Sequence, residues 1–104
     1  MHSALVLASL LVLAAPQHPH VVRYAPHVVL GWTHDGERVW RFEVERAIAG
    51  GAFKRIGTPG RDARTFRDPT SRPGVTYLYR LRAVGADAVS RYSDEILVKV
   101  RTAR

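Results

Sequence analysis

The chain has 104 residues, of which 46% are hydrophobic, so it can form one domain with a core and is too apolar for a disordered tail. It contains no cysteine, which excludes disulfides, thiolate zinc sites, a cysteine nucleophile and lipid attachment through a cysteine. Its formal charge of +7 comes from 14 arginines and two lysines against nine acids, spread along the chain from Arg23 to Arg104. That spread favours a mixed, solvated surface over a nucleic-acid footprint.

The first fifteen residues are typical of a targeting segment. An unbroken run of apolar and small residues extends from Ala4 to Ala15. It is too short for a bilayer span of about 20 residues but has the length of a signal-peptide core. We expect residues 1–15 to be a signal peptide, with cleavage after Ala14 favoured because Pro16 disfavours a cut after Ala15. A buried first helix is the weaker alternative, because the run has no polar face. The chain is therefore predicted to be secreted or periplasmic, with no membrane span after cleavage.

Residues 16–20 contain two prolines and are predicted to be a linker without regular structure. From Val21 onward the hydrophobic pattern alternates with a period of two, which predicts strands. In the first clear strand, Val28, Leu30 and Trp32 share one face. The next runs over residues 38–46 with one wet face. Its predicted inward residues are Trp40, Phe42 and Val44, and its predicted outward residues are Arg41, Glu43 and Glu45.

Four further short strands follow, separated by turns rich in glycine and proline. They are predicted over residues 52–56, 63–67, 75–83 and 95–100. In the third of these, Tyr77, Tyr79, Leu81 and Ala83 are predicted to point inward. With a compressed first strand that begins at about Val21, these make seven short strands without a convincing helix, which indicates an antiparallel sandwich or a small barrel.

Several motifs, in this order, resemble those of the fibronectin type III family. Leu30-x-Trp32 is similar to its second strand, and Phe42-Glu43-Val44-Glu45-Arg46 to its third. Residues 72–84, which read RPGVTYLYRLRAV, are similar to the family's most specific signature, although Val75 is inserted between the glycine and the threonine. Ser90-Arg91-Tyr92-Ser93 resembles the stretch before the last strand. The resemblance covers residues 21 to about 102, so we place the domain at residues 21–104.

The resemblance implies an all-β, immunoglobulin-like, seven-stranded antiparallel β-sandwich. In such sandwiches a tyrosine at the corner before the sixth strand bonds to an upstream backbone group, and Tyr77 occupies that position. Trp32 would fill the space between the sheets. The residues expected in the core are Trp32, Trp40, Phe42, Tyr77, Tyr79 and Leu81.

No arrangement of residues predicts catalysis. The serines lack a nucleophile-elbow motif. Glu43 and Glu45 lie about 7 Å apart on one strand face, a spacing that could suggest a glycosidase pair. The resemblance instead places them opposite Arg80 and Arg82 as cross-strand ion pairs. His18, His20, His27 and His34 have no accompanying acid or thiol, so no metal site and no cofactor are predicted.

The candidate contact surface is a flat basic face formed by Arg41, Arg80 and Arg82 with Tyr92 nearby. Together these features predict a non-catalytic extracytoplasmic module for binding, adhesion or spacing that contacts a surface protein or glycan. Two alternatives stay open: an accessory module of a carbohydrate-active enzyme, and a polyanion-binding domain that uses the basic sheet face. Nucleic acid is disfavoured as a partner, and a monomer is expected.

Overall fold

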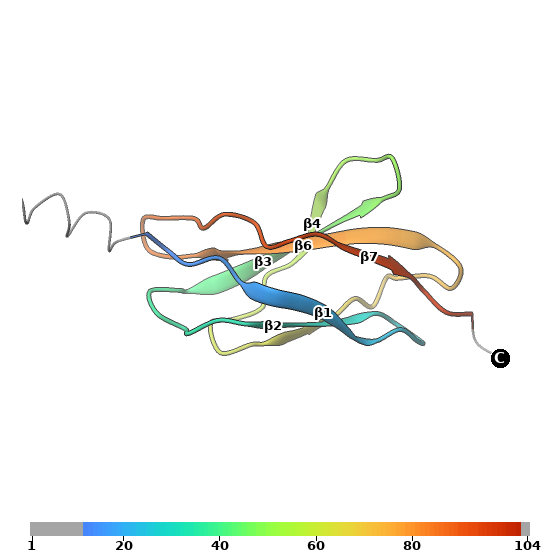
Figure 1. Ribbon diagram of the computed structural model, residues 1–104, viewed down its shortest axis with the longest axis horizontal. Coiled ribbons are helices and arrows are strands. Elements are labelled where there is room, and N and C mark those ends of the chain that lie inside the picture. Colours follow the sequence, from blue (N-terminus) through green and yellow to red (C-terminus); the bar gives the residue numbers. More distant parts are fainter. Residues whose placement is uncertain (1–11, 103–104) are drawn as a thin grey trace, which may run out of the picture.

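The computed structural model describes residues 12–102, which form two packed antiparallel sheets and contain no helix (Figure 1). One sheet has the order β1-β2-β5, with β1 at Gln17–Arg23, β2 at Val29–Thr33 and β5 at Thr65–Arg67. The other has the order β4-β3-β6-β7, with β4 at Lys54–Gly57, β3 at Arg41–Ile48, β6 at Thr76–Val84 and β7 at Ile96–Lys99. The predicted seven-stranded sandwich is confirmed.

The central pair of strands, β3 and β6, follows from alternation in the sequence. β6 buries every second residue from Tyr77 to Ala83 and leaves the residues between them partly exposed. It pairs with β3 over eight consecutive positions, from Arg41↔Val84 to Ile48↔Tyr77. A one-residue slip would turn the buried set toward water, so the pattern itself fixes this register.

The core lies between the two sheets and is closed by aromatic contacts. Trp32 of β2 is 3% exposed and meets Phe42 of β3 edge to face, with ring centroids 5.4 Å apart. The predicted core residues that the structure buries are Trp32, Phe42, Tyr77, Tyr79 and Leu81.

Trp40 is the exception, and its predicted place in the core is wrong. The side chain is 61% exposed, while the neighbouring Val39 is buried. The backbone turns at Arg38, which has a φ of 65°, and bends again at Trp40, so β3 begins only at Arg41. Strict alternation holds only within an extended strand, and this bend makes Val39 the inward residue in place of Trp40.

The corner before β6 is fixed by two tyrosines and a buried carboxylate. The Tyr77 hydroxyl accepts a hydrogen bond of 3.1 Å from the backbone N–H of Arg72, which is the corner contact that the resemblance implied. Asp68 accepts bonds from the Tyr79 hydroxyl at 2.7 Å and from Arg46 Nη1 at 2.9 Å, and Thr70 donates two more through its N–H and hydroxyl. These bonds join β3, β6 and the loop after β5.

The N-terminal part of the described chain differs from the expected linker. Residues 17–20 belong to β1, which pairs with β2 with irregular register, and Pro16 is buried. A strand tolerates Pro19 here because β1 is an edge strand, where one side of the backbone needs no partner. Gly31 of β2 leaves room for His20, whose ring atom Nε2 would lie 2.7 Å from a Cβ at that position.

The end of the apolar N-terminal run belongs to the sandwich. Leu13 is 4% exposed and is part of the core cluster, whereas Val12 is 75% exposed. Cleavage after Ala14 would remove Leu13 from this core. Residues 1–11, which make up most of the predicted signal peptide, lie outside the described residues.

Leu13→Ala is expected to lower the free energy of unfolding by about 2 kcal/mol, because it removes a buried side chain and leaves a void at the end of the core. Val12→Ala is the matched control and is expected to change stability by less than about 0.5 kcal/mol. Urea unfolding of the full chain followed by circular dichroism measures both changes. Equal effects would show that Leu13 is not a core residue.

Candidate binding surface

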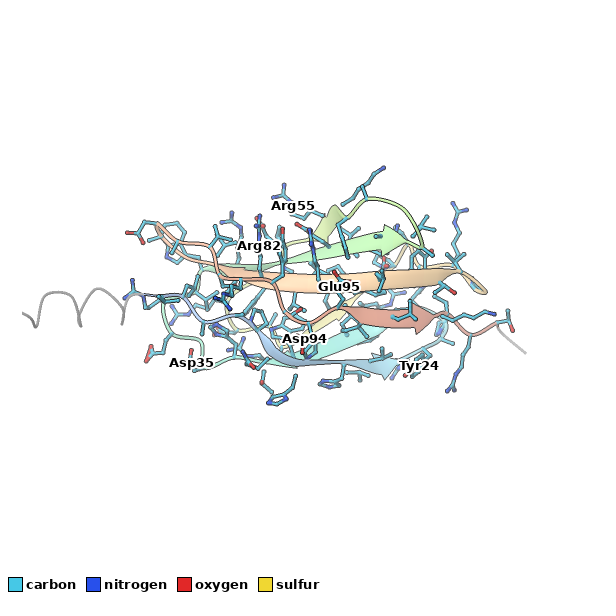
Figure 2. All side chains as sticks on the ribbon, turned by 45° about the horizontal axis from the view of Figure 1, so that its top comes forward. Tyr24, Asp35, Arg55, Arg82, Asp94 and Glu95 are labelled. Carbon is cyan, nitrogen blue, oxygen red and sulfur yellow. The ribbon has the colours of Figure 1, made fainter. Side chains whose placement is uncertain are left out.

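The outer face of the four-stranded sheet carries the candidate surface. In β6, the residues between the buried ones are partly exposed, and the β3 residues that pair with Arg80 and Arg82 lie beside them on this face. The register places Glu43 opposite Arg82 and Glu45 opposite Arg80, which confirms the cross-strand pairing expected for these residues. Figure 2 shows Arg55 and Arg82 on the side of this sheet that faces away from β1 and β2.

Glu43 is surrounded by three guanidinium groups. Arg82 Nε lies 2.9 Å from Oε1, Arg55 Nη1 lies 3.2 Å from Oε2, and Arg41 Nη2 lies 3.8 Å from Oε2. Burial raises the pKa of Glu43, but the hydrogen bonds and charges of Arg82 and Arg55 outweigh burial and hold this pKa below its ordinary value. Glu43 is therefore a carboxylate at neutral pH.

Glu45 has one arginine and one tyrosine as partners. Arg80 approaches Oε1 with both Nε and Nη2, each at 2.8 Å. The Tyr92 hydroxyl donates to Oε2 at 2.8 Å. Both oxygens of this carboxylate are thus engaged by the protein itself.

Aromatic rings separate and support the guanidinium groups. The guanidinium of Arg80 lies between two rings, 4.0 Å from the Phe53 centroid and 3.7 Å from the Tyr92 centroid. Arg82 lies 4.8 Å from the same Tyr92 ring. Such stacking is worth about 0.5–1 kcal/mol per contact at exposed sites and limits side-chain movement. We call this group of side chains the arginine ladder; its members are Arg41, Arg55, Arg80, Arg82, Glu43, Glu45, Phe53 and Tyr92.

Two serine hydroxyls hold Tyr92 in place. Ser90 Oγ accepts the backbone N–H of Ala83 at 2.8 Å, and Ser93 Oγ accepts that of Leu81 at 3.1 Å. The segment 90–93 is thereby fixed along β6, so Tyr92 reaches the arginine ladder from the chain that leads into β7.

The arginine ladder presents positive charge outward. Four guanidinium groups share two carboxylates, so its formal charge is positive. The side chains of Glu43 and Glu45 are only 6% and 12% exposed, whereas that of Arg55 is 59% exposed. A ligand approaching this face therefore meets guanidinium edges before carboxylates. Arginine N–H groups in fixed positions suit bidentate contacts with carboxylate, sulfate or phosphate oxygens.

The structure brings together all four residues of the contact surface predicted from the sequence, namely Arg41, Arg80, Arg82 and Tyr92. It adds Arg55 and Phe53, which come from β4 and the turn before it and were not predicted as part of the surface. The sequence feature that could have revealed Arg55 and Phe53 is Gly50-Gly51, which predicts a hairpin that returns the chain beside β3. Glu43 and Glu45 lie on the same face, as their predicted pairing with Arg82 and Arg80 requires.

Of the four histidines in residues 12–102, three contact backbone carbonyl groups. His20 contacts the carbonyl of His18, His27 that of Ser71, and His34 that of Ala14. Over residues 12–102, no three His, Cys, Asp or Glu side chains are grouped so that they could hold a metal ion. The same part of the chain has no helix long and apolar enough to cross a bilayer.

The comparisons with known proteins establish the fold. No protein-family model matches the sequence, and no curated protein is similar to it in sequence. Among solved structures, titin domains A168–A170 match with a TM-score of 0.76 and 17% identity, over 88% of this chain and 33% of that one. A fibronectin type III-like protein from Clostridium thermocellum matches with a TM-score of 0.71 and 20% identity, over 88% of this chain and 96% of that one.

A third structure is pectate lyase PelI from Erwinia chrysanthemi in complex with tetragalacturonic acid. It matches with a TM-score of 0.70 and 25% identity, over 81% of this chain and 28% of that one. The chain thus spans a third or less of the titin and pectate lyase chains. Its fold is that of a fibronectin type III domain, and the match covers only part of each of these two larger chains.

Proposed function

We propose that this chain is a non-catalytic extracytoplasmic binding module whose arginine ladder contacts an acidic polysaccharide. The observation that carries the proposal is the excess of guanidinium over carboxylate groups on one flat sheet face, with the carboxylates shielded and Arg55 largely exposed. Acidic glycans offer repeated carboxylates, which match a row of guanidinium groups.

The rigidity of the arginine ladder supports a binding role. An exposed arginine normally loses side-chain entropy when it binds a ligand. Here Arg80 and Arg82 are already held by Glu45, Glu43 and Tyr92, so that cost is met on folding. The chain's formal charge of +7 adds a long-range attraction for polyanions.

The comparison with PelI supports the class of ligand. That enzyme is a pectate lyase and its structure holds tetragalacturonic acid, an acidic oligosaccharide. The match of this fold to part of a carbohydrate-active enzyme favours a glycan-binding role for this chain. The apolar run from Ala4 to Ala15 supports delivery of this chain outside the cytoplasm.

The test is affinity electrophoresis of the full chain in gels containing polygalacturonate, with dextran gels as the neutral reference. Retardation is expected in polygalacturonate only and is expected to fall steeply with salt. Arg41→Gln combined with Arg55→Gln is expected to weaken binding several-fold and to reduce the salt slope by about two, one for each lost charge contact. These residues are chosen because Glu43 keeps Arg82 as its partner.

Arg67→Gln combined with Arg23→Gln is the matched control, because both arginines are exposed on the other sheet. It removes the same formal charge and is expected to change retention much less. Equal losses in the two double variants would show that only net charge matters and would rule out the arginine ladder as the site.

A spacer role is the second candidate, favoured by the positions of the chain ends. The described chain enters at one end of the sandwich and leaves at the other, so flanking segments would be held apart (Figure 1). The same gels separate the two functions: equal migration of the wild-type chain in polygalacturonate and dextran would leave the spacer role and reject the binding role.

A further inference from the structure

An exposed tryptophan lies in a groove at the end of the sandwich where the described chain begins. The groove has a volume of about 230 Å³, and Trp40, which is 61% exposed, is one of its lining residues. Its other lining residues are Arg38, Gly85, Ala86, Asp87 and Ala88, together with Leu13, which the predicted cleavage after Ala14 would remove. The arginine ladder does not include any of these residues, although Arg41 follows Trp40 directly in the chain.

The walls of this groove are fixed by backbone contacts. Trp40 N–H donates to the carbonyl of Val84 at 2.8 Å, and Gly85 N–H donates to that of Ala88 at 2.8 Å. A Cβ at Gly85 would lie 2.5 Å from the Arg38 carbonyl oxygen, so only glycine fits there. Arg38 itself has a φ of 65°, an uncommon backbone conformation for a residue with a side chain, and such conformations are often found at functional sites.

The chemistry of the groove matches a sugar ring. An exposed indole offers a flat apolar surface, and a pyranose has a face of C–H groups that can lie on it. Arg38 and Asp87 also line the groove and are exposed, and their N–H donors and acceptor oxygens suit the ring's hydroxyl groups. An acyl chain would gain nothing from these two charged groups.

We propose that this groove is a subsite for one pyranose ring of a polysaccharide, with Trp40 as the stacking platform. The inference rests on the proposed function and deepens it, because it assigns ring recognition to Trp40 and charge recognition to the arginine ladder. Since Arg41 adjoins Trp40, a single polysaccharide chain can span both.

The test uses NMR of the full chain titrated with tetragalacturonate and, separately, with a neutral tetrasaccharide of glucose. Trp40 and Trp32 are the two tryptophans, so the indole N–H spectrum contains one exposed reporter and one buried reference. The Trp40 signal is expected to shift saturably with tetragalacturonate, and the Trp32 signal is expected to stay in place. Trp40→Ala is expected to weaken binding about tenfold and Trp40→Phe only about two- to threefold.

Salt separates the subsite from the arginine ladder. Stacking involves no net charge, so the ratio of wild-type to Trp40→Ala affinity is expected to be the same at low and at high salt. An unmoved Trp40 signal together with ladder-dependent retention on polygalacturonate would overturn the subsite and leave the proposed function intact. A saturable Trp40 shift with the neutral sugar, without any retention on polygalacturonate, would reject the arginine ladder and support the subsite. Equal shifts of Trp40 and Trp32 would also overturn the subsite, because the contact would not be local.

Discussion

Trp32→Ala is expected to lower the free energy of unfolding by about 4 kcal/mol, within the range of about 3–5 kcal/mol seen when buried tryptophan or phenylalanine is truncated. Trp32 is almost fully buried between the sheets and packs on Phe42. Neighbouring residues belong to two hydrogen-bonded sheets and cannot collapse into the void. The loss is comparable with the entire stability of a small domain, so the variant is expected to be largely unfolded.

Trp32→Phe is expected to be much milder, at about 1–2 kcal/mol. The indole Nε1 of Trp32 is buried and has no hydrogen-bond partner among the described residues. Phenylalanine removes this unsatisfied donor, whose burial costs about 1–3 kcal/mol, and this gain offsets part of the lost volume.

Trp40→Ala provides the control, because Trp40 is exposed and its removal is expected to change stability by less than about 0.5 kcal/mol. Urea unfolding followed by far-ultraviolet circular dichroism compares all three variants without relying on tryptophan emission. Similar losses for Trp32→Ala and Trp40→Ala would contradict the two-layer core described above.

Asp68→Asn is expected to cost about 3 kcal/mol, because breaking one partner of a buried ion pair leaves the other charge uncompensated. Asp68 joins Arg46 of β3, Tyr79 of β6 and Thr70 of the loop after β5. Asparagine keeps the volume but loses the charge that Arg46 requires. Asp94→Asn, at an exposed position, is the control and is expected to change stability by less than about 0.5 kcal/mol.

The dependence of the unfolding free energy on pH tests the role of the Asp68 carboxylate in a second way. Burial raises the pKa of Asp68, but hydrogen bonds from Tyr79, Thr70 and Arg46 outweigh it and hold this pKa below the ordinary value of 3.8. The stabilisation is therefore complete above pH about 4 and is lost as the pH falls through the lower, folded-state pKa. Burial and the bond to Asp68 raise the pKa of Tyr79, so its hydroxyl stays a donor throughout.

Unfolding free energies measured from pH 7 down to pH 2 are expected to fall in the acid range for the wild-type chain. The fall is expected to be shallower in Asp68→Asn, with the remainder due in part to Glu43, whose pKa is also lowered. Parallel profiles for the two chains would contradict the role given to the Asp68 carboxylate.

A strand could be predicted where apolar and polar residues alternate over many positions and where its pairing with the adjacent strands is regular. β6 satisfies this condition from Tyr77 to Ala83. Its pairing with β3 was expected from the resemblance to the fibronectin type III family, which places Glu43 and Glu45 opposite Arg82 and Arg80. The placement of Trp40 failed because a bend set by the backbone at Arg38 cannot be recognised from hydrophobicity. The first part of β1, residues 17–20, was predicted to be a linker because Pro16 and Pro19 suggest a break, and the edge position that tolerates Pro19 becomes known only from the assembled sheet.

The candidate surface was predictable in part for a similar reason. Arg80, Arg82 and Arg41 follow from the outward positions of two long strands. Arg55 and Phe53 depend on the path of the short hairpin into β4, which pairs with β3 through an irregular register after Val44. The strand β4 has only four residues, too few for an alternating pattern to show which side chains point outward.

The central claim is that an acidic glycan binds on the arginine ladder, and arginine side-chain N–H spectra of the full chain, titrated with tetragalacturonate at constant salt, test it most directly. The claim predicts saturable shifts for Arg41, Arg55, Arg80 and Arg82, with the signal of Arg67 on the opposite sheet unchanged. Shifts spread evenly over all arginines, or confined to those outside the arginine ladder, would contradict it.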